Sequence, residues 1–254
     1  MSAPAQAVHK HVEHCMGTVF SFHLVAAVDE QAAVTAALAD AVAWLRWVDA
    51  TFSTYQPGSV ISRLGRGELG IEQCPAAVGE VLAACEQVQA ASNGYFSAYA
   101  SGTLDPSGYV KGWAIERASD LLVRHGYGDH MINGGGDIQC RGSDAAGQPW
   151  RLGIVDPADG TAVIAVVSGN DVALATSGNA ERGEHIVDPR PSAGQPGEPG
   201  RPGPLAVRSV SIYGRHLALA DAYATAAFAM GPDGPAWVRT LPGYEGYFHP
   251  PAAG

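Results

Sequence analysis

The chain has 254 residues, of which 46% are hydrophobic and 16% are charged. This size fits one large domain or two small ones, and the apolar content is sufficient for a real core. The formal net charge of −10 argues against a nucleic-acid backbone or an anionic membrane as the main partner. A phosphate ligand remains possible, because backbone N–H groups and a metal ion can hold one inside an acidic protein.

Hydropathy and cysteine usage indicate a cytoplasmic protein. Residues 1–18 contain no apolar core of a signal peptide, and no run reaches transmembrane length. The cysteines lack the spacing of a metal site or a redox pair. They are therefore expected to be reduced thiols, and they are Cys15, Cys74, Cys85 and Cys140.

The first half of the chain is predicted to be mostly helical after one strand. Helix starts and stops are marked by ordinary signals, such as a possible Ser59 cap and the Asn93-Gly94 stop. The predicted elements are a strand over 16–28, a long helix over 29–50, a short helix over 60–64 and a helix over 75–92.

The second half is predicted to be rich in antiparallel strands. A Pro/Gly loop at 190–204 interrupts it without resembling a domain linker. The predicted elements are a helix over 111–125, strands near 131–132, 138–141, 150–155, 162–167, 171–176 and 205–213, and a helix over 217–230. The whole pattern predicts an α+β fold with largely antiparallel sheets and a few long helices. Residues 1–15 are expected to be a flexible N-terminus and 16–254 a single domain.

The segment 173–189 is read as two strands joined by a polar loop. This arrangement would bring the Thr176 and Ser177 hydroxyls near the imidazole of His185. A histidine there could accept a proton from a hydroxyl at neutral pH. The alternative is a hairpin in which the histidine merely caps a strand.

Asp221 and Thr225 stand four residues apart on a predicted helix, so their oxygens share one face. A carboxylate beside a hydroxyl suits Mg²⁺, which takes few protein ligands and completes its shell with water and substrate phosphate. The alternative is a threonine bonded back to a carbonyl and an aspartate that caps the helix start.

Two glycine-containing turns are further candidates for ligand contact. In Asn133-Gly134-Gly135-Gly136-Asp137 the backbone can pass close to a ligand, although a tight turn without a ligand explains it equally well. The pattern is not GxGxxG and precedes no helix, which excludes a dinucleotide-binding βαβ motif. The turn before Lys111 leads into a helix start and can hold an anion; Lys111 is either a phosphate contact or a solvated side chain.

Six segments together resemble, in order, the FAD:protein FMN transferases, the ApbE family. They are MGTVFSF, FSTYQPGSVISRL, GYVKGWAIERASDLL, INGGGDI, ATSGNAERGEHIVDP and ADAYATAAFAMG, and the likeness runs from about residue 16 to 247. The resemblance implies a T-fold-like α+β architecture and a bound FAD. It also implies a Mg²⁺-dependent attachment of FMN to a Thr or Ser of an acceptor flavoprotein, with release of AMP.

The resemblance also assigns residue roles. Asp221, Thr225 and a backbone carbonyl near Ser107–Gly108 match the family's metal ligands, and His185 matches its proposed base. The candidate FAD-contacting residues are Met16, Gly17, Tyr55, Asp105, Ser107, Lys111, Asn133, Gly134, Gly135, Gly136, Asp137, Thr176 and Ser177.

The chain departs from the family pattern at a few places. The segment between Gly94 and Asp105 is much shorter, Ser97 follows Phe96 where the family usually has Asp, and Glu116 replaces a frequent Asp. The shortened segment removes part of one pocket wall. Two alternatives therefore stay open beside the transferase: a FAD pyrophosphatase that yields FMN and AMP, and a non-catalytic FAD-binding protein.

Overall fold

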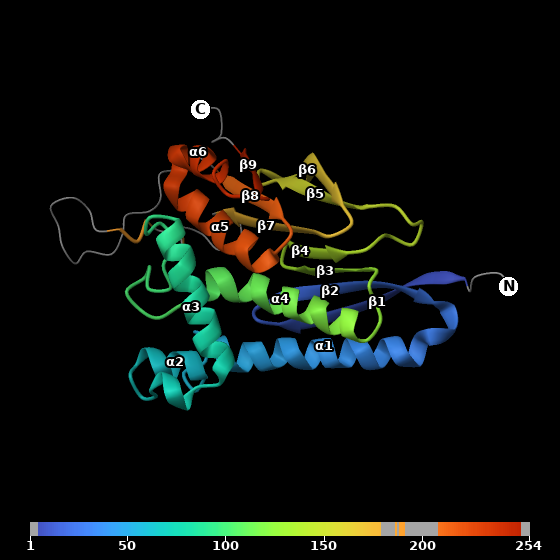
Figure 1. Cartoon of the computed structure of the whole chain (residues 1–254), viewed down its shortest axis with the longest axis horizontal. Helices are drawn as coiled ribbons and strands as arrows, with labels where there is room; N and C mark the ends of the chain where they lie inside the picture. The colour runs from blue at the N-terminus through green and yellow to red at the C-terminus, as the bar shows by residue number, and fades with distance from the viewer. Residues whose placement is uncertain (1–4, 179–185, 187, 191–207, 250–254) are drawn as a thin grey trace.

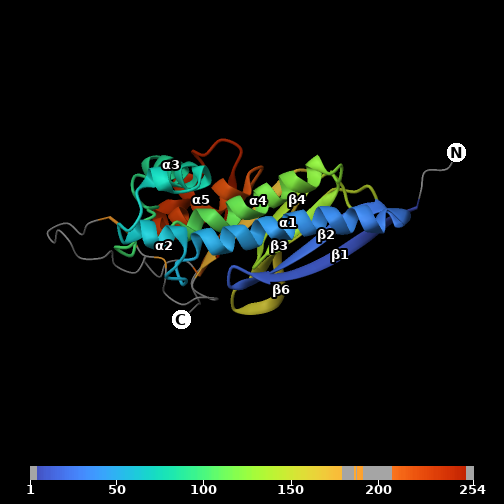
Figure 2. The same ribbon diagram turned by 90° about the horizontal axis from the view of Figure 1, so that it is seen from below.

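The computed structural model describes residues 5–178, 186, 188–190 and 208–249. Helices cover one face of a long antiparallel sheet, and a separate hairpin lies on the other face (Figures 1 and 2). This arrangement confirms the predicted α+β class with antiparallel sheets. Within these residues no helix combines the length and the apolar stretch needed to cross a bilayer.

The main sheet has seven strands in the order β1-β2-β3-β4-β7-β8-β9, and every neighbouring pair is antiparallel. Its strands are β1 (Gln6–Cys15), β2 (Thr18–Ala27), β3 (His130–Gly134), β4 (Asp137–Arg141), β7 (Val172–Gly178), β8 (Ser209–Gly214) and β9 (Glu245–His249). The hairpin of β5 (Trp150–Asp156) and β6 (Asp159–Gly169) forms a second sheet.

The helices are α1 (Gln31–Phe52), α2 (Val60–Gly65), α3 (Ala76–Ala91), α4 (Ser107–Arg124), α5 (Leu217–Met230) and α6 (Gly234–Val238). Three short 3₁₀ turns accompany them, at Val28–Glu30, Ile71–Gln73 and Gly231–Asp233. The predicted helix over 217–230 agrees with α5 at both ends. Ser59 caps α2 as predicted, because its Oγ accepts the Ser62 N–H at 3.1 Å.

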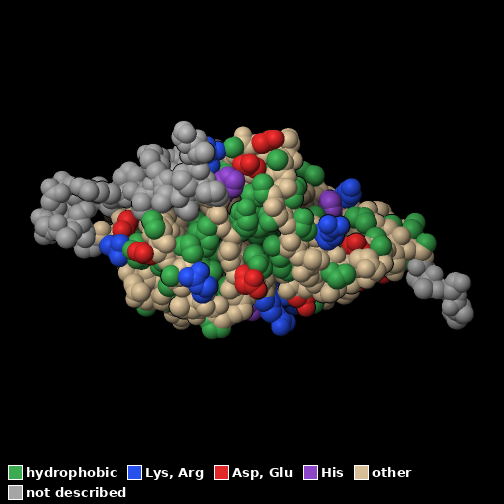
Figure 3. Space-filling model, turned by 90° about the horizontal axis from the view of Figure 1, so that it is seen from above, with side chains coloured by type: hydrophobic (Ala, Val, Ile, Leu, Met, Phe, Trp, Pro, Cys, Tyr) green, Lys and Arg blue, Asp and Glu red, His purple; other side chains and the backbone are tan. Residues whose placement is uncertain are grey.

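Two cores hold the layers together. The larger core lies between the helices and the sheet, and in it Trp44, Phe52 and Trp113 meet edge to face across α1 and α4. The smaller core lies under the β5–β6 hairpin around Trp150 and Leu152. On the face seen in Figure 3, hydrophobic side chains gather along the middle between charged ones.

Part of the segment 1–15 that was predicted to be a flexible N-terminus is a strand. Residues 6–15 form β1 and pair with β2 along their whole length. The inward-facing positions of this strand include histidine and glutamate, so it lacks an apolar alternation. One of its contacts to the helical layer is polar: Arg46 of α1 donates hydrogen bonds of 3.0 and 3.1 Å to Glu13. A contact with a residue of another element therefore helps to hold β1 in place. Such a contact cannot be recognised from the local sequence pattern.

Two other boundaries differ from the predictions. Helix α4 begins at Ser107 and not near residue 111, because the Asp105 carboxylate accepts the Ser107 N–H at 3.0 Å and starts the helix early. The expected second strand at 185–187 is not seen: Ile186 is not in a strand, and residues 185 and 187 lie outside the described residues. Strand β7 instead pairs with β4 and β8.

Candidate active site

The close contact between α4 and α5 organises the candidate site. Helix α5 is rich in alanine and is buried on nearly all sides, which lets another helix approach its backbone closely. The approach is close at Gly112 of α4, where a Cβ would lie 2.5 Å from the Leu217 carbonyl oxygen and 2.9 Å from Asp221 Cβ. Only glycine fits there. The two helices therefore meet backbone to backbone at this point.

Asp221 is nearly buried at this contact, with 5% of its surface exposed. Its Oδ2 accepts the backbone N–H of Gly112 at 2.9 Å. Asp221 is the fifth residue of α5, so it does not cap the helix start, which was the structural alternative. A buried carboxylate needs such donors or a cation to offset the loss of water.

Thr225 lies one turn further along α5 and faces the first turn of α4. Its Oγ1 is 3.3 Å from Ser177 Oγ of β7 and 3.2 Å from the position that a Cβ on Gly108 would occupy. Asp221, Thr225, Ser177 and the α4 backbone at Gly108 are therefore brought together from three separate elements.

This oxygen set fits a small hard cation such as Mg²⁺. In an α-helix the Gly112 N–H points to the carbonyl of Gly108, four residues earlier. The same N–H also bonds Asp221. A carbonyl oxygen has two lone pairs, so that of Gly108 retains accepting capacity toward a cation. Among the described residues no group of three or more His, Cys, Asp or Glu side chains could hold a metal ion, so a site here would rely on one carboxylate, hydroxyls and a carbonyl.

The glycine-rich segment forms the tight β3–β4 turn. Gly135 and Gly136 have φ values of 59° and 89°, and Gly134 pairs with Asp137 across the hairpin. The Gly136 N–H is donated to Asn133 Oδ1 at 3.0 Å and the Gly135 N–H to the Val19 carbonyl at 3.2 Å. These two N–H groups are therefore used within the protein. What the turn can offer a ligand is a bare backbone surface.

Asp137 links this turn to the helices. It is 1% exposed, its Oδ2 lies 2.8 Å from Lys111 Nζ, and its Oδ1 accepts the Thr176 N–H at 3.1 Å. Lys111 is thus neither a simple solvated residue nor, in this structure, a free phosphate contact. The ion pair fastens α4 to β4 and β7 beside the α4–α5 contact.

The β1–β2 turn lies at the same end of the sheet. Met16 and Gly17 have φ values of 52° and 68° and form a two-residue hairpin turn. The next residue, Thr18, is so close to Gly135 that a Cβ there would lie 2.6 Å from its Oγ1. The two predicted turns are thus neighbours.

Other predicted residues are not brought into this group. Tyr55 is 91% exposed after the end of α1. The Thr176 hydroxyl pairs with Ser211 Oγ of β8 at 2.7 Å, a partner that the sequence did not indicate. Asp105 serves the start of α4 through Ser107. His185 lies outside the described residues, so its expected proximity to Thr176 and Ser177 stays a prediction.

Two residues that follow His185 contact the rest of the protein. Ile186 is buried in the larger core, and the Arg190 guanidinium lies 3.4 Å from the centroid of the Tyr95 ring. Arg190 also bonds the Asp188 carboxylate at 2.8 Å. This stack ties the end of the segment to the short connection between α3 and α4. No local pattern predicts this contact, because Tyr95 and Arg190 are far apart in the chain.

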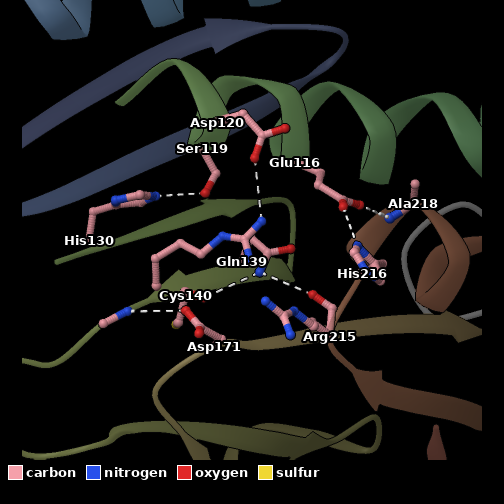
Figure 4. A network of polar contacts seen from close by, with 12 residues as sticks. Glu116, Ser119, Asp120, His130, Gln139, Cys140, Asp171, Arg215, His216 and Ala218 are labelled. Carbon is pink, nitrogen blue, oxygen red and sulfur yellow. Dashed lines mark hydrogen bonds and ion pairs between the residues drawn. The ribbon is translucent and has the colours of Figure 1, made fainter. Parts of the chain in front are cut away.

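A network of polar contacts, from buried to exposed, extends along α4 away from these residues (Figure 4). Glu116 contacts His216 and Ala218 at the start of α5, and Ser119 Oγ lies 2.7 Å from His130 Nε2. Burial lowers the pKa of His130 to about 4, so its imidazole is neutral at pH 7. His130 is fully buried and its other ring nitrogen lies 2.8 Å from the Tyr127 carbonyl, so both nitrogens have partners within the scaffold.

The comparison with known families decides the classification. The model of the ApbE family matches residues 16–101 and 98–248. The chain belongs to the ApbE family. The predicted family architecture is also confirmed by solved structures. Flavin transferase ApbE from Vibrio cholerae superposes with a TM-score of 0.77 at 20% identity over 96% of this chain and 97% of that one. The apo Pseudomonas stutzeri flavinyl transferase ApbE gives 0.78 at 22% identity over 98% and 96%.

Curated ApbE-family relatives match part of their length. The FAD:protein FMN transferase of Vibrio cholerae is 32% identical over 50% of this chain and 39% of its own length. The Rhodobacter capsulatus protein of the same name is 38% identical over 50% of this chain and 24% of its own length. The alignments thus span well under half of these relatives.

Proposed function

We propose that this ApbE-family chain transfers FMN from FAD to a Thr or Ser hydroxyl of an acceptor flavoprotein in a Mg²⁺-dependent reaction that releases AMP. The observation that carries the proposal is the meeting of Asp221, Thr225 and the α4 backbone at Gly108, because these oxygens suit a magnesium ion beside a pyrophosphate. The names of the matched relatives support the flavin chemistry.

In the proposed reaction the acceptor hydroxyl oxygen attacks the FMN-side phosphorus of FAD. A new P–O bond forms, the pyrophosphate P–O bond breaks, and AMP leaves with the bridging oxygen. His185 is proposed to take the hydroxyl proton. A bound Mg²⁺ would supply charge neutralisation at the phosphates. Most of the acceleration is expected from positioning and electrostatics, as in phosphoryl transfer generally.

The other residues are proposed to hold the metal ion or to contact the FAD. Asp221 and Thr225 would hold the metal, and the first turn of α4 would place Ser107 and Gly108 beside it. The turns at Met16–Gly17 and Gly134–Gly136 are proposed to contact the FAD, together with the Lys111–Asp137 pair, Tyr55, Asn133, Asp105, Thr176 and Ser177. The closeness of the two turns and the Lys111–Asp137 pair beside the α4–α5 contact support this for those residues. Tyr55, which is exposed, Asp105 and the Thr176 hydroxyl have no such support.

The deciding experiment is mass spectrometry of a flavin-acceptor domain after incubation with this protein, FAD and Mg²⁺. A mass gain of one FMN that disappears on chelation of Mg²⁺ supports the proposal. Free FMN and AMP with an unmodified acceptor would indicate the pyrophosphatase instead. Intact FAD with every acceptor tried would indicate a binding protein, and both results would overturn the transferase.

A further inference from the structure

The N-terminus of α5 is held by a residue of another helix. Its N-cap position is His216, and no side chain of α5 caps the first turn. The Ala218 N–H is donated instead to Glu116 Oε2 of α4 at 3.1 Å, and the other oxygen, Oε1, lies 2.7 Å from His216 Nδ1 (Figure 4). The Glu116 side chain is only 16% exposed. A carboxylate at a helix N-terminus also interacts favourably with the helix dipole.

Glu116 is one of three α4 residues that contact α5 at intervals of one turn. Gly108 lies against Thr225, Gly112 against Asp221, and Glu116 against the first turn of α5. These residues are spaced four apart, so they form a single ridge of α4. The two glycines allow close approach and have no side chains that would resist sliding. The directional contacts along this ridge are the Gly112 N–H bond to Asp221 and the two contacts of the Glu116 carboxylate at the start of α5.

We infer that Glu116 is a positioning residue for the proposed metal site: it fixes α5 along α4 so that Asp221 and Thr225 face the α4 first turn. This inference rests on the proposed function, since it concerns the same Mg²⁺ ligands. A loss of the bond at Ala218 lets α5 shift along the glycine ridge. The Asp221 carboxylate then moves relative to the Gly112 N–H and the Gly108 carbonyl.

The test must separate positioning from ordinary helix capping. Glu116→Ala removes both effects. In Glu116→Ala/His216→Asp the new aspartate caps α5 locally, because Ala218 is the second residue of the helix and its N–H is a normal N-cap partner. The double variant thus restores the cap without restoring the link to α4. Glu80→Ala is the matched control: Glu80 lies on α3 with a 61% exposed side chain and pairs with Arg117, next to Glu116.

The first measurement is calorimetric titration of the full chain with Mg²⁺ alone. Glu116→Ala and the double variant are expected to bind Mg²⁺ roughly 10–100-fold more weakly than wild type, as is usual when a group that orients a metal ligand is removed. The double variant recovers the thermal stability, and Glu80→Ala binds as wild type does. Wild-type affinity in Glu116→Ala, or full recovery of affinity in the double variant, would overturn the inference.

The second measurement needs no metal. Hydrogen exchange at the Gly112 amide is expected to be faster in the double variant than in wild type, because the amide loses its Asp221 acceptor and keeps only its helical bond to Gly108. Unchanged exchange contradicts the positioning role. If wild type itself binds no Mg²⁺ but exchange responds as expected, the proposed metal site fails and the structural role of Glu116 stands.

Discussion

Asp221 and Gly112 are 109 residues apart in the sequence, yet the carboxylate of one accepts the backbone N–H of the other at 2.9 Å. The bond lies at a close approach of α4 and α5, and one turn from it Thr225 faces Gly108. The geometry of the proposed metal site therefore depends on the packing of two helices. Substitutions that change this packing are expected to affect the site and the stability together.

Gly112→Ala is expected to destabilise the fold. The added methyl group would lie 2.5 Å from the Leu217 carbonyl oxygen, and it would force the two backbones apart. The expected cost in the free energy of unfolding is about 1–3 kcal/mol. Gly79→Ala in α3 is the matched control, because nothing lies within 4 Å of its Cβ position and alanine favours a helix by about 0.5–1 kcal/mol. Urea unfolding of both variants tests this, and equal stabilities would contradict it.

Asp221→Asn is expected to abolish Mg²⁺-dependent transfer with little change in the fold. The amide keeps the shape and an oxygen that can accept the Gly112 N–H, but it loses the charge that would hold the cation. Transfer to an acceptor should fall at least about 100-fold, since a metal ligand supplies several kcal/mol of charge stabilisation. Asp120→Asn, on the same helix as Gly112 but paired with Arg141, should retain activity. Undiminished transfer by Asp221→Asn would exclude the metal role.

Lys111→Met tests whether this lysine is structural. Asp137 is 1% exposed, so removal of its cationic partner leaves a buried carboxylate without that partner. The expected loss in the free energy of unfolding is about 3 kcal/mol. The double variant Lys111→Met/Asp137→Asn removes the charge as well and should recover most of the loss. A double-mutant cycle by chemical denaturation measures the coupling, and additive losses would show that the pair contributes nothing.

His130 predicts a specific pH dependence of stability. Burial lowers its pKa from 6.5 to about 4, so the unfolded chain binds a proton in this range before the folded protein does. The stabilising contribution of neutral His130 to the free energy of unfolding is therefore fully present above pH 6.5, and it is lost as the pH falls toward 4. The free energy of unfolding is expected to decrease by about 3 kcal/mol over this range. His130→Asn, which can still bond the Tyr127 carbonyl, should lack this component when unfolding is measured between pH 7 and 4. Parallel curves for the two proteins would contradict the prediction.

The sequence by itself determined most elements and the types of residue in the site. The helix over 217–230 and the Ser59 cap follow from local periodicity and local hydrogen bonds, and the glycine pattern at 133–137 predicted a tight turn. Asp221 and Thr225 could be paired as candidate metal ligands because helical spacing alone puts them on one face. The fold class followed from the order of strands and helices.

Only the tertiary structure decided which partners those residues have. The sequence left Lys111 open between a phosphate contact and a solvated side chain, and the structure pairs it with Asp137. It gave no sign that Glu116 holds the start of α5 or that residues 6–15 form an edge strand on α1. The reason is physical: periodicity records which face of an element is buried, but these contacts join distant residues. They exist only once helices and sheet have packed.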